Sequence, residues 1–145
     1  MKTSLINPIM TMMIQTPPTD NPPLLGLGHD ILELDRIESS YQRYGERFIS
    51  RILTKKERDY CLKHTDPLPH IAGRFCAKEA LAKALGTGIG KEVGWQDLEI
   101  INDPKGKPVV FVSEKISLQF NSPKLIISIS HSKTYVSSVA LWIAS

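Results

Sequence analysis

The chain has 145 residues, enough for one globular domain with a buried core. With 41% hydrophobic and 23% charged residues, its composition is ordinary for a globular protein. The net charge of +3 is too small to indicate nucleic-acid binding by itself, and no run approaches the roughly 18 apolar residues that a membrane span needs.

The first 23 residues differ in composition from the rest. They are rich in Pro, Thr and Asn and follow neither a helical nor an alternating pattern, so we expect a disordered extension. Lys2 before a mildly apolar run resembles a signal peptide, but Pro8 interrupts the run and no small-residue cleavage pattern follows. Three methionines between positions 10 and 13 leave a later start of translation open. We expect residues 24–145 to form a single domain.

A strand and a basic helical segment come next. Residues 24–34 mix apolar residues with glycines and predict a strand. Asp35 is a candidate cap for a helix that begins near Arg36. Gly45 weakens the helical pattern and allows a break. Arginines spaced by four residues would lie on one face of this segment, namely Arg43, Arg47 and Arg51.

The remaining pattern has helices first and strands later. Thr54-Lys-Lys-Glu57 is a capping box that opens a short helix through about Lys63. The longest helical pattern follows at about 69–85, and glycines after it favour a left-handed turn. Five segments complete the chain: strands at 98–102 and 108–112 joined by a hairpin turn, a short helix at 113–120, and strands at 124–130 and 135–143. We therefore predict an α+β fold, with an antiparallel sheet packed against a long central helix and shorter helices.

Neither glycine cluster is a nucleotide-binding fingerprint. After Gly26 and Gly28, the third glycine of GxGxxG would fall at Ile31, and the segment 86–91 lacks the first glycine and the Ser/Thr of a P-loop. Both clusters are interpreted as turns, either of which could approach a ligand closely.

Two acidic residues stand in unusual settings. Asp30 lies at the end of the predicted strand, and Glu79 lies in the long predicted helix with Arg74, Lys78 and Lys83 around it. Taken singly, Asp30 is interpreted as a loop or cap acid, and Glu79 with Lys83 as a surface ion pair. Three cations around one acid are nevertheless more suited to an anion than to solubility alone. Two carboxylates with nearby lysines are what a Mg²⁺-assisted reaction on a phosphate ester needs.

Histidines and cysteines give weaker signals. His131 ends an alternating strand among hydroxyls and a lysine, where a structural role and phosphate binding are both open. Cys61 and Cys76 have no CxxC or metal spacing, so we expect buried thiols and a reducing cytoplasm. Three histidines are assigned no role: His29, His64 and His70.

The basic segment 36–58 has three interpretations. It is a solvated face, a docking surface for an acidic partner, or a nucleic-acid surface. Its four-residue period, with Phe48 and Ile52 among the cations, favours an acidic partner. Nucleic acid is the rival partner, but only Tyr41, Tyr44 and Phe48 are placed to stack on bases.

Taken together, these segments resemble the holo-acyl-carrier-protein synthase family, the small phosphopantetheinyl transferases. The order and spacing match from about Leu24 to the C-terminus, and six weak motifs in order are highly specific. These motifs are Gly26-x-Gly28-x-Asp30-Ile-x-Glu33-x-x-Arg36, Arg51-Ile-Leu-Thr54-x-x-Glu57, Ala72-Gly-Arg74-Phe-x-Ala-Lys78-Glu79-Ala-x-x-Lys83-Ala-x-Gly86-Thr-Gly88-Ile-Gly90, Asp97-Leu-Glu-Ile, Gly106-Lys107-Pro108 and Ser128-Ile-Ser130-His131-Ser132.

The resemblance implies a reaction and a set of sites. The family moves 4′-phosphopantetheine from coenzyme A to a serine of apo acyl carrier protein, releases adenosine 3′,5′-bisphosphate, and serves fatty acid biosynthesis. It implies Mg²⁺ on Asp30 and Glu79, with a bound water or Glu79 itself as the base, and Lys83 on the phosphates at the reacting centre. Coenzyme A would be bound by Arg74, Lys83, Lys107, Pro108, His131 and Ser132. The carrier protein would dock on Arg36, Arg43, Arg47 and Arg51.

The resemblance also implies a homotrimer, with active sites between neighbouring subunits and no nucleic-acid or membrane partner. His29 departs from the apolar or small residue that many relatives carry beside the metal site. The alternative function is a non-catalytic module that binds coenzyme A or another nucleotide.

Overall fold

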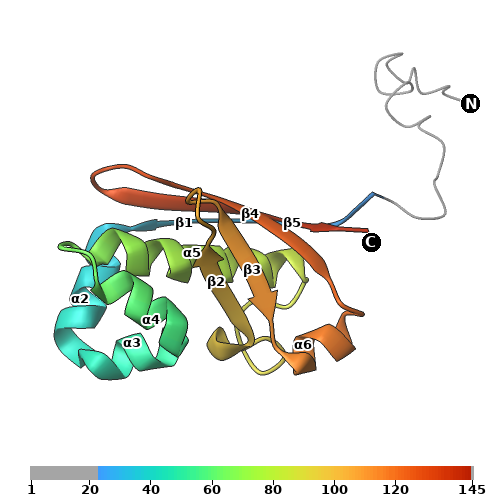
Figure 1. Ribbon diagram of the computed structural model, residues 1–145, viewed down its shortest axis with the longest axis horizontal. Helices are drawn as coiled ribbons and strands as arrows, with labels where there is room; N and C mark the ends of the chain where they lie inside the picture. The colour runs from blue at the N-terminus through green and yellow to red at the C-terminus, as the bar shows by residue number, and fades with distance from the viewer. Residues whose placement is uncertain (1–22, 145) are drawn as a thin grey trace, which may run out of the picture.

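The computed structural model describes residues 23–144 (Figure 1), so the predicted extension lies outside the described residues except for Pro23. In chain order the elements are β1 (Leu24–Glu33), α2 (Leu34–Tyr44), α3 (Glu46–Ile52), α4 (Lys55–Leu62), α5 (Leu68–Ala84), the 3₁₀ turn η1 (Trp95–Asp97), β2 (Leu98–Asn102), β3 (Pro108–Val112), α6 (Glu114–Gln119), β4 (Lys124–His131) and β5 (Tyr135–Ile143). The predicted α+β class is confirmed. No helix among the described residues is long and apolar enough to cross a membrane.

Two antiparallel sheets organise the molecule. The larger has the strand order β1-β5-β4, and β2 pairs with β3 in a separate hairpin. The long helix α5 lies along one face of the larger sheet, and the other described helices lie on that same side (Figure 1). In this register Asp30 of β1 is opposite Ser138 of β5.

Two glycines of β1 allow α5 to approach the strand closely. A Cβ atom added at Gly28 would overlap the carbonyl oxygen of Ala80, and one at Gly26 would overlap that of Ala84. The interpretation of these glycines as turn residues was therefore wrong, because both lie within the strand. Their close approach is to helix α5, and it brings the backbone that carries Asp30 against the helix.

Helix boundaries follow the local chemistry, with one exception. The Thr54 capping box is confirmed: its hydroxyl accepts from the backbone of Glu57, and the Glu57 carboxylate accepts from the backbone of Thr54. The break at Gly45 is also confirmed, with a positive φ of 55° between α2 and α3. Asp35 does not cap α2, which begins one residue earlier at Leu34; it lies in the first turn instead.

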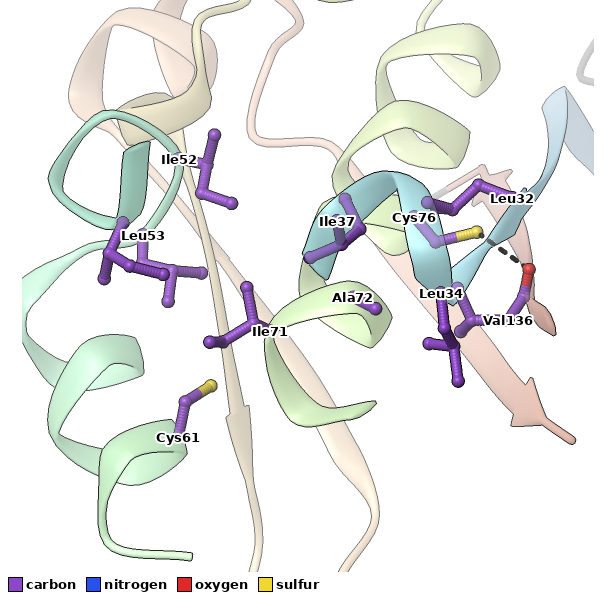
Figure 2. Close-up of a cluster of buried hydrophobic side chains, with 11 residues drawn as sticks. Leu32, Leu34, Ile37, Ile52, Leu53, Cys61, Ile71, Ala72, Cys76 and Val136 are labelled. Carbon is purple, nitrogen blue, oxygen red and sulfur yellow. Dashed lines mark hydrogen bonds between the residues drawn. The ribbon is translucent and has the colours of Figure 1, made fainter. Parts of the chain in front are cut away.

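The core consists of two clusters, one packed on the first half of α5 and the other on its second half. Figure 2 shows the first, where Ile71 and Ala72 of α5 meet side chains from β1, α2, α3, α4 and β5. Both cysteines are free and buried, as predicted, and the Cys76 thiol lies 3.2 Å from the backbone oxygen of Asp30. The second cluster packs the other half of α5 against β2 and α6.

The outer face of the larger sheet has an apolar centre. Four of its side chains are exposed by 39–60%: Leu27, Ile31, Ile126 and Val139. Among them, the His29 ring contacts the Ser137 hydroxyl at 3.0 Å. No described helix lies on this side of the sheet (Figure 1).

Candidate functional site

The two predicted acids face each other across the contact between β1 and α5. Lys83 Nζ lies 3.0 Å from Asp30 Oδ1 and 3.1 Å from the backbone oxygen of His29. Glu79, one turn earlier on α5, is half-buried. Burial raises the pKa of Glu79, the charge of Asp30 raises it further, and Lys83 opposes both. Asp30, Glu79 and Lys83 are therefore brought together, with two carboxylates close enough to repel.

Lys78 does not belong to this group, so the prediction of three cations around Glu79 was wrong. Its side chain is fully buried, and Nζ donates to Glu57 Oε1 at 2.6 Å and to the backbone oxygens of Ile52 and Trp95 at 2.7 and 2.8 Å. Burial lowers the pKa of Lys78, and Glu57 opposes that effect. Because successive helix positions differ by about 100°, Lys78 points into the core while Glu79 faces the sheet edge.

A second candidate site is a cavity of about 210 Å³ between α5, the β2–β3 hairpin and the end of β4. Its walls include three predicted nucleotide-binding residues, Arg74, Pro108 and His131. Tyr60 and Asn102 contribute further polar lining that the sequence did not reveal.

Arg74 is the cation at the base of this cavity. It is 97% buried by area, with 3% exposed, and lies over the Tyr60 ring at 4.3 Å. Its Nη2 donates to Asn102 Oδ1 at 2.7 Å, but its Nε has no hydrogen-bond partner and no carboxylate within the described residues forms an ion pair with it. A buried guanidinium without a counter-charge favours an anionic ligand in this cavity.

Three of the predicted coenzyme A residues do not line the cavity. Lys107 is exposed, and its backbone nitrogen donates to Asp103 in the β2–β3 turn. Ser132 is exposed in the β4–β5 turn, where its hydroxyl accepts from the backbone of Tyr135 at 3.0 Å. Lys83 lies with the acid pair.

A groove of about 520 Å³ runs along α2 and α3. It is lined by Ser40, Tyr44, Arg47, Phe48 and Arg51. Thus two of the four predicted docking arginines line an open groove that also has an aromatic wall. The other two lie on α2, where Arg36 is exposed and the Arg43 guanidinium lies 5.2 Å from the Tyr44 ring.

The acid pair and the cavity face different directions. Arg74 and Glu79 are five residues apart on α5, which corresponds to about 140° around the helix and about 7.5 Å along it. The cavity lining includes none of Asp30, Glu79 or Lys83. The acid pair and the cavity are therefore two separate groups of residues on this chain.

Comparison with known proteins gives a consistent result. Residues 26–140 match the family model described as the 4′-phosphopantetheinyl transferase superfamily. Holo-[acyl-carrier-protein] synthase of Protochlamydia amoebophila is 50% identical over 118 residues, covering 81% of this chain and 97% of that protein. The solved structure of a holo-(acyl-carrier-protein) synthase from Bacillus anthracis in complex with CoA (3′,5′-ADP) has a TM-score of 0.73 and 40% identity, and covers 84% of this chain and 98% of its own.

The Helicobacter pylori holo-[acyl-carrier-protein] synthase structure, in complex with coenzyme A, gives a TM-score of 0.74 with 36% identity over 80% of this chain and 98% of that one. The family match covers β1 through most of β5, so it includes the acid pair, the cavity and the groove. The chain belongs to the 4′-phosphopantetheinyl transferase superfamily.

Proposed function

We propose that this protein transfers 4′-phosphopantetheine from coenzyme A to a serine of apo acyl carrier protein and releases adenosine 3′,5′-bisphosphate. The observation that carries the proposal is the cluster of Asp30, Glu79 and Lys83 where β1 meets α5. Relatives named for this activity, two of them solved with coenzyme A or its nucleotide, support it. Residues 24–145 would then form one transferase domain, and free buried cysteines support a cytoplasmic location.

Asp30 and Glu79 fit a divalent cation. The described residues hold no group of three or more His, Cys, Asp and Glu side chains arranged for a metal. Two carboxylates are nevertheless what Mg²⁺ needs from a protein, because substrate phosphates and water complete its coordination. Their mutual repulsion, which contributes to the raised pKa of Glu79, would be relieved by a bound divalent cation. When bound, Mg²⁺ supplies stabilisation of the charge that develops on the departing bisphosphate.

The chain's own groups account for the other parts of the reaction. Lys83 holds Asp30 in place and presents its ammonium to the pyrophosphate of coenzyme A. Glu79 accepts the serine proton, directly or through a water molecule.

The cavity would bind the nucleotide end of coenzyme A. Arg74 offers the unpaired charge for the 3′-phosphate, and Pro108 and His131 form part of the wall. Lys107 and Ser132 lie in the neighbouring turns, and we propose that they contact the nucleotide from the rim.

The groove along α2 and α3 would receive the acidic helix of the carrier protein. Arg47 and Arg51 supply positive charge, whose attraction for the carrier weakens at high salt. Phe48 and Tyr44 supply apolar contacts whose contribution to binding salt does not screen. Arg36 and Arg43 would extend the positive surface beyond the groove. Arg47→Glu should raise the KM for carrier protein and leave the KM for coenzyme A unchanged; equal KM values for carrier would contradict this role.

We propose a homotrimer in which one chain's acid pair meets the next chain's cavity. Two observations support it: the parts face different directions on α5, and the outer sheet face exposes Leu27, Ile31 and Val139. Exposed apolar side chains gathered on one sheet face are typical of subunit interfaces.

The test is the intact mass of apo acyl carrier protein after incubation with the protein, coenzyme A and Mg²⁺. A gain of about 340 Da, the mass of one phosphopantetheine group, is expected in this sample and not in an EDTA control. Asp30→Ala should slow the gain at least about 10²-fold. If no carrier gains mass while coenzyme A still binds, the protein is a non-catalytic binding module.

A further inference from the structure

Two histidines lie face to face beside the nucleotide cavity. The rings of His64 and His70 are stacked, with centroids 3.6 Å apart and planes inclined by 25°. Tyr60 meets both rings edge-on, at 4.9 and 5.8 Å. His70 lines the cavity together with Arg74 and His131, whereas His64 lies behind it after the end of α4.

Hydrogen bonding leaves a nitrogen of each ring open to a proton. His64 Nδ1 lies 2.9 Å from the backbone oxygen of Tyr60. A carbonyl oxygen only accepts, so Nδ1 carries the hydrogen and Nε2 is the nitrogen that would gain a proton. The ring of His70 has no hydrogen-bond partner within the part of the chain that the structure describes.

The surroundings keep His70 neutral while the cavity holds no anion. Burial is the largest cause that lowers the pKa of His70. The charges of His64 on the α4 side, Arg74 on α5 and His131 at the end of β4 lower it further. Asp66, in the loop before α5, acts in the opposite direction. Lys63 adds a further cation nearby, with Nζ 4.6 Å from the Tyr60 ring.

A phosphate dianion in the cavity would reverse this balance. It would compensate the charge of Arg74 and favour a second cation beside it, because an opposite charge within a few ångströms stabilises an imidazolium. We propose that His70 is a further substrate-recognition residue, which takes up a proton when the 3′-phosphate of coenzyme A enters the cavity. This inference rests on the proposed function, which assigns the nucleotide to this cavity.

The consequence is an affinity for coenzyme A that increases with acidity. For one linked proton, the Kd should fall by up to about tenfold per pH unit between pH 8 and 6.5. Below that range the phosphate itself begins to gain a proton, since its second pKa is about 6. Dephospho-coenzyme A lacks the 3′-phosphate, so its affinity should change little over the same range.

The experiment is calorimetric titration of the full chain with coenzyme A and dephospho-coenzyme A at pH 7, in two buffers of different ionisation enthalpy. The difference in heat between the buffers counts the protons bound. Three variants are compared with the original chain: His70→Phe, which keeps a stacking ring; His64→Phe, which removes the facing imidazole; and His131→Asn, which removes the other cavity histidine. Circular dichroism confirms that each variant is folded.

The expected result is proton uptake with coenzyme A that disappears with dephospho-coenzyme A and in His70→Phe. His64→Phe should keep the proton uptake, because His70 takes up the proton and the phenyl ring preserves the stack. Uptake that persists in His70→Phe and is lost in His131→Asn overturns the inference, as does equal uptake with both ligands. Failure of the original chain to bind coenzyme A at any pH instead refutes the proposed nucleotide site.

Discussion

The buried pair of Lys78 and Glu57 gives the most decisive test of how the described fold is held together. Lys78→Met keeps a long side chain at the position but removes the ammonium. Its loss leaves the Glu57 carboxylate without a counter-charge and the backbone oxygens of Ile52 and Trp95 without a donor. Removing one partner of a buried pair costs about 3–5 kcal/mol, a large part of the roughly 5–15 kcal/mol by which a domain is stable.

Two further variants isolate the cause. Glu57→Gln combined with Lys78→Met removes both charges, while the amide oxygen can still accept from the backbone of either Thr54 or Ile100, which bind different oxygens of Glu57. This double variant should lose less stability than Lys78→Met alone. Lys55→Met is the surface control: Lys55 pairs with Asp59 at 3.2 Å with both side chains mostly exposed, and its loss should cost less than about 0.5 kcal/mol.

Urea unfolding, followed by circular dichroism at one fixed protein concentration, measures all three free energies. The fixed concentration matters because association would add to the apparent stability. A Lys78→Met variant that loses no more stability than Lys55→Met would contradict this prediction. A double variant that loses as much as Lys78→Met alone would contradict it as well, since the uncompensated charge would then contribute nothing.

Three other predictions follow from the site and the core. Glu79→Gln should raise the Tm in metal-free buffer, because the raised pKa means that the fold disfavours the charged carboxylate; an unchanged or lower Tm would contradict this. Asp30→Ala and Arg74→Ala chains, each inactive alone, should recover about one quarter of wild-type activity when they are unfolded, mixed in equal amounts and refolded. With random assembly, an intact acid pair on one chain meets an intact cavity on its neighbour in that share of sites. Zero recovery would refute sites shared between chains. Burial raises the thiol pKa of Cys61 to about 11 and that of Cys76 to about 12, from 9.0. Their contribution to stability is therefore present below pH 9 and lost as the pH rises towards 11–12. In urea unfolding at several pH values, replacing both cysteines by alanine should reduce the fall in the free energy of unfolding over this range.

Local patterns predicted most of the fold because their chemistry is contained in neighbouring residues. The Thr54 capping box, the break at Gly45 and the alternating strand at β4 depend on a few positions each. The role of Gly28 could not be predicted in this way, because the atom that excludes a side chain there belongs to Ala80, which is distant in the sequence.

The candidate site also combines features that the sequence predicted with features that only the fold reveals. The resemblance paired Asp30 with Glu79, and the fold brings these two acids together where β1 meets α5. Lys78 was misjudged because spacing on a helix surface does not show which face is buried. The pairing of Lys78 with Glu57 spans 21 positions and needs the fold. His64 and His70 gave no signal, because their stacking depends on the loop between α4 and α5.

At Gly26 and Gly28, main-chain atoms of β1 lie directly against main-chain atoms of α5, so most core side chains do not set the geometry of the acid pair. Gly26 and Gly28 set the distance between strand and helix mainly through the backbone atoms of Ala84 and Ala80. The side chains around Ile71 and Val136 can therefore be exchanged, in protein engineering or in evolutionary drift, without moving Asp30 relative to Glu79. A more heat-resistant form is thus best sought in that cluster, while the two glycines admit no substitute.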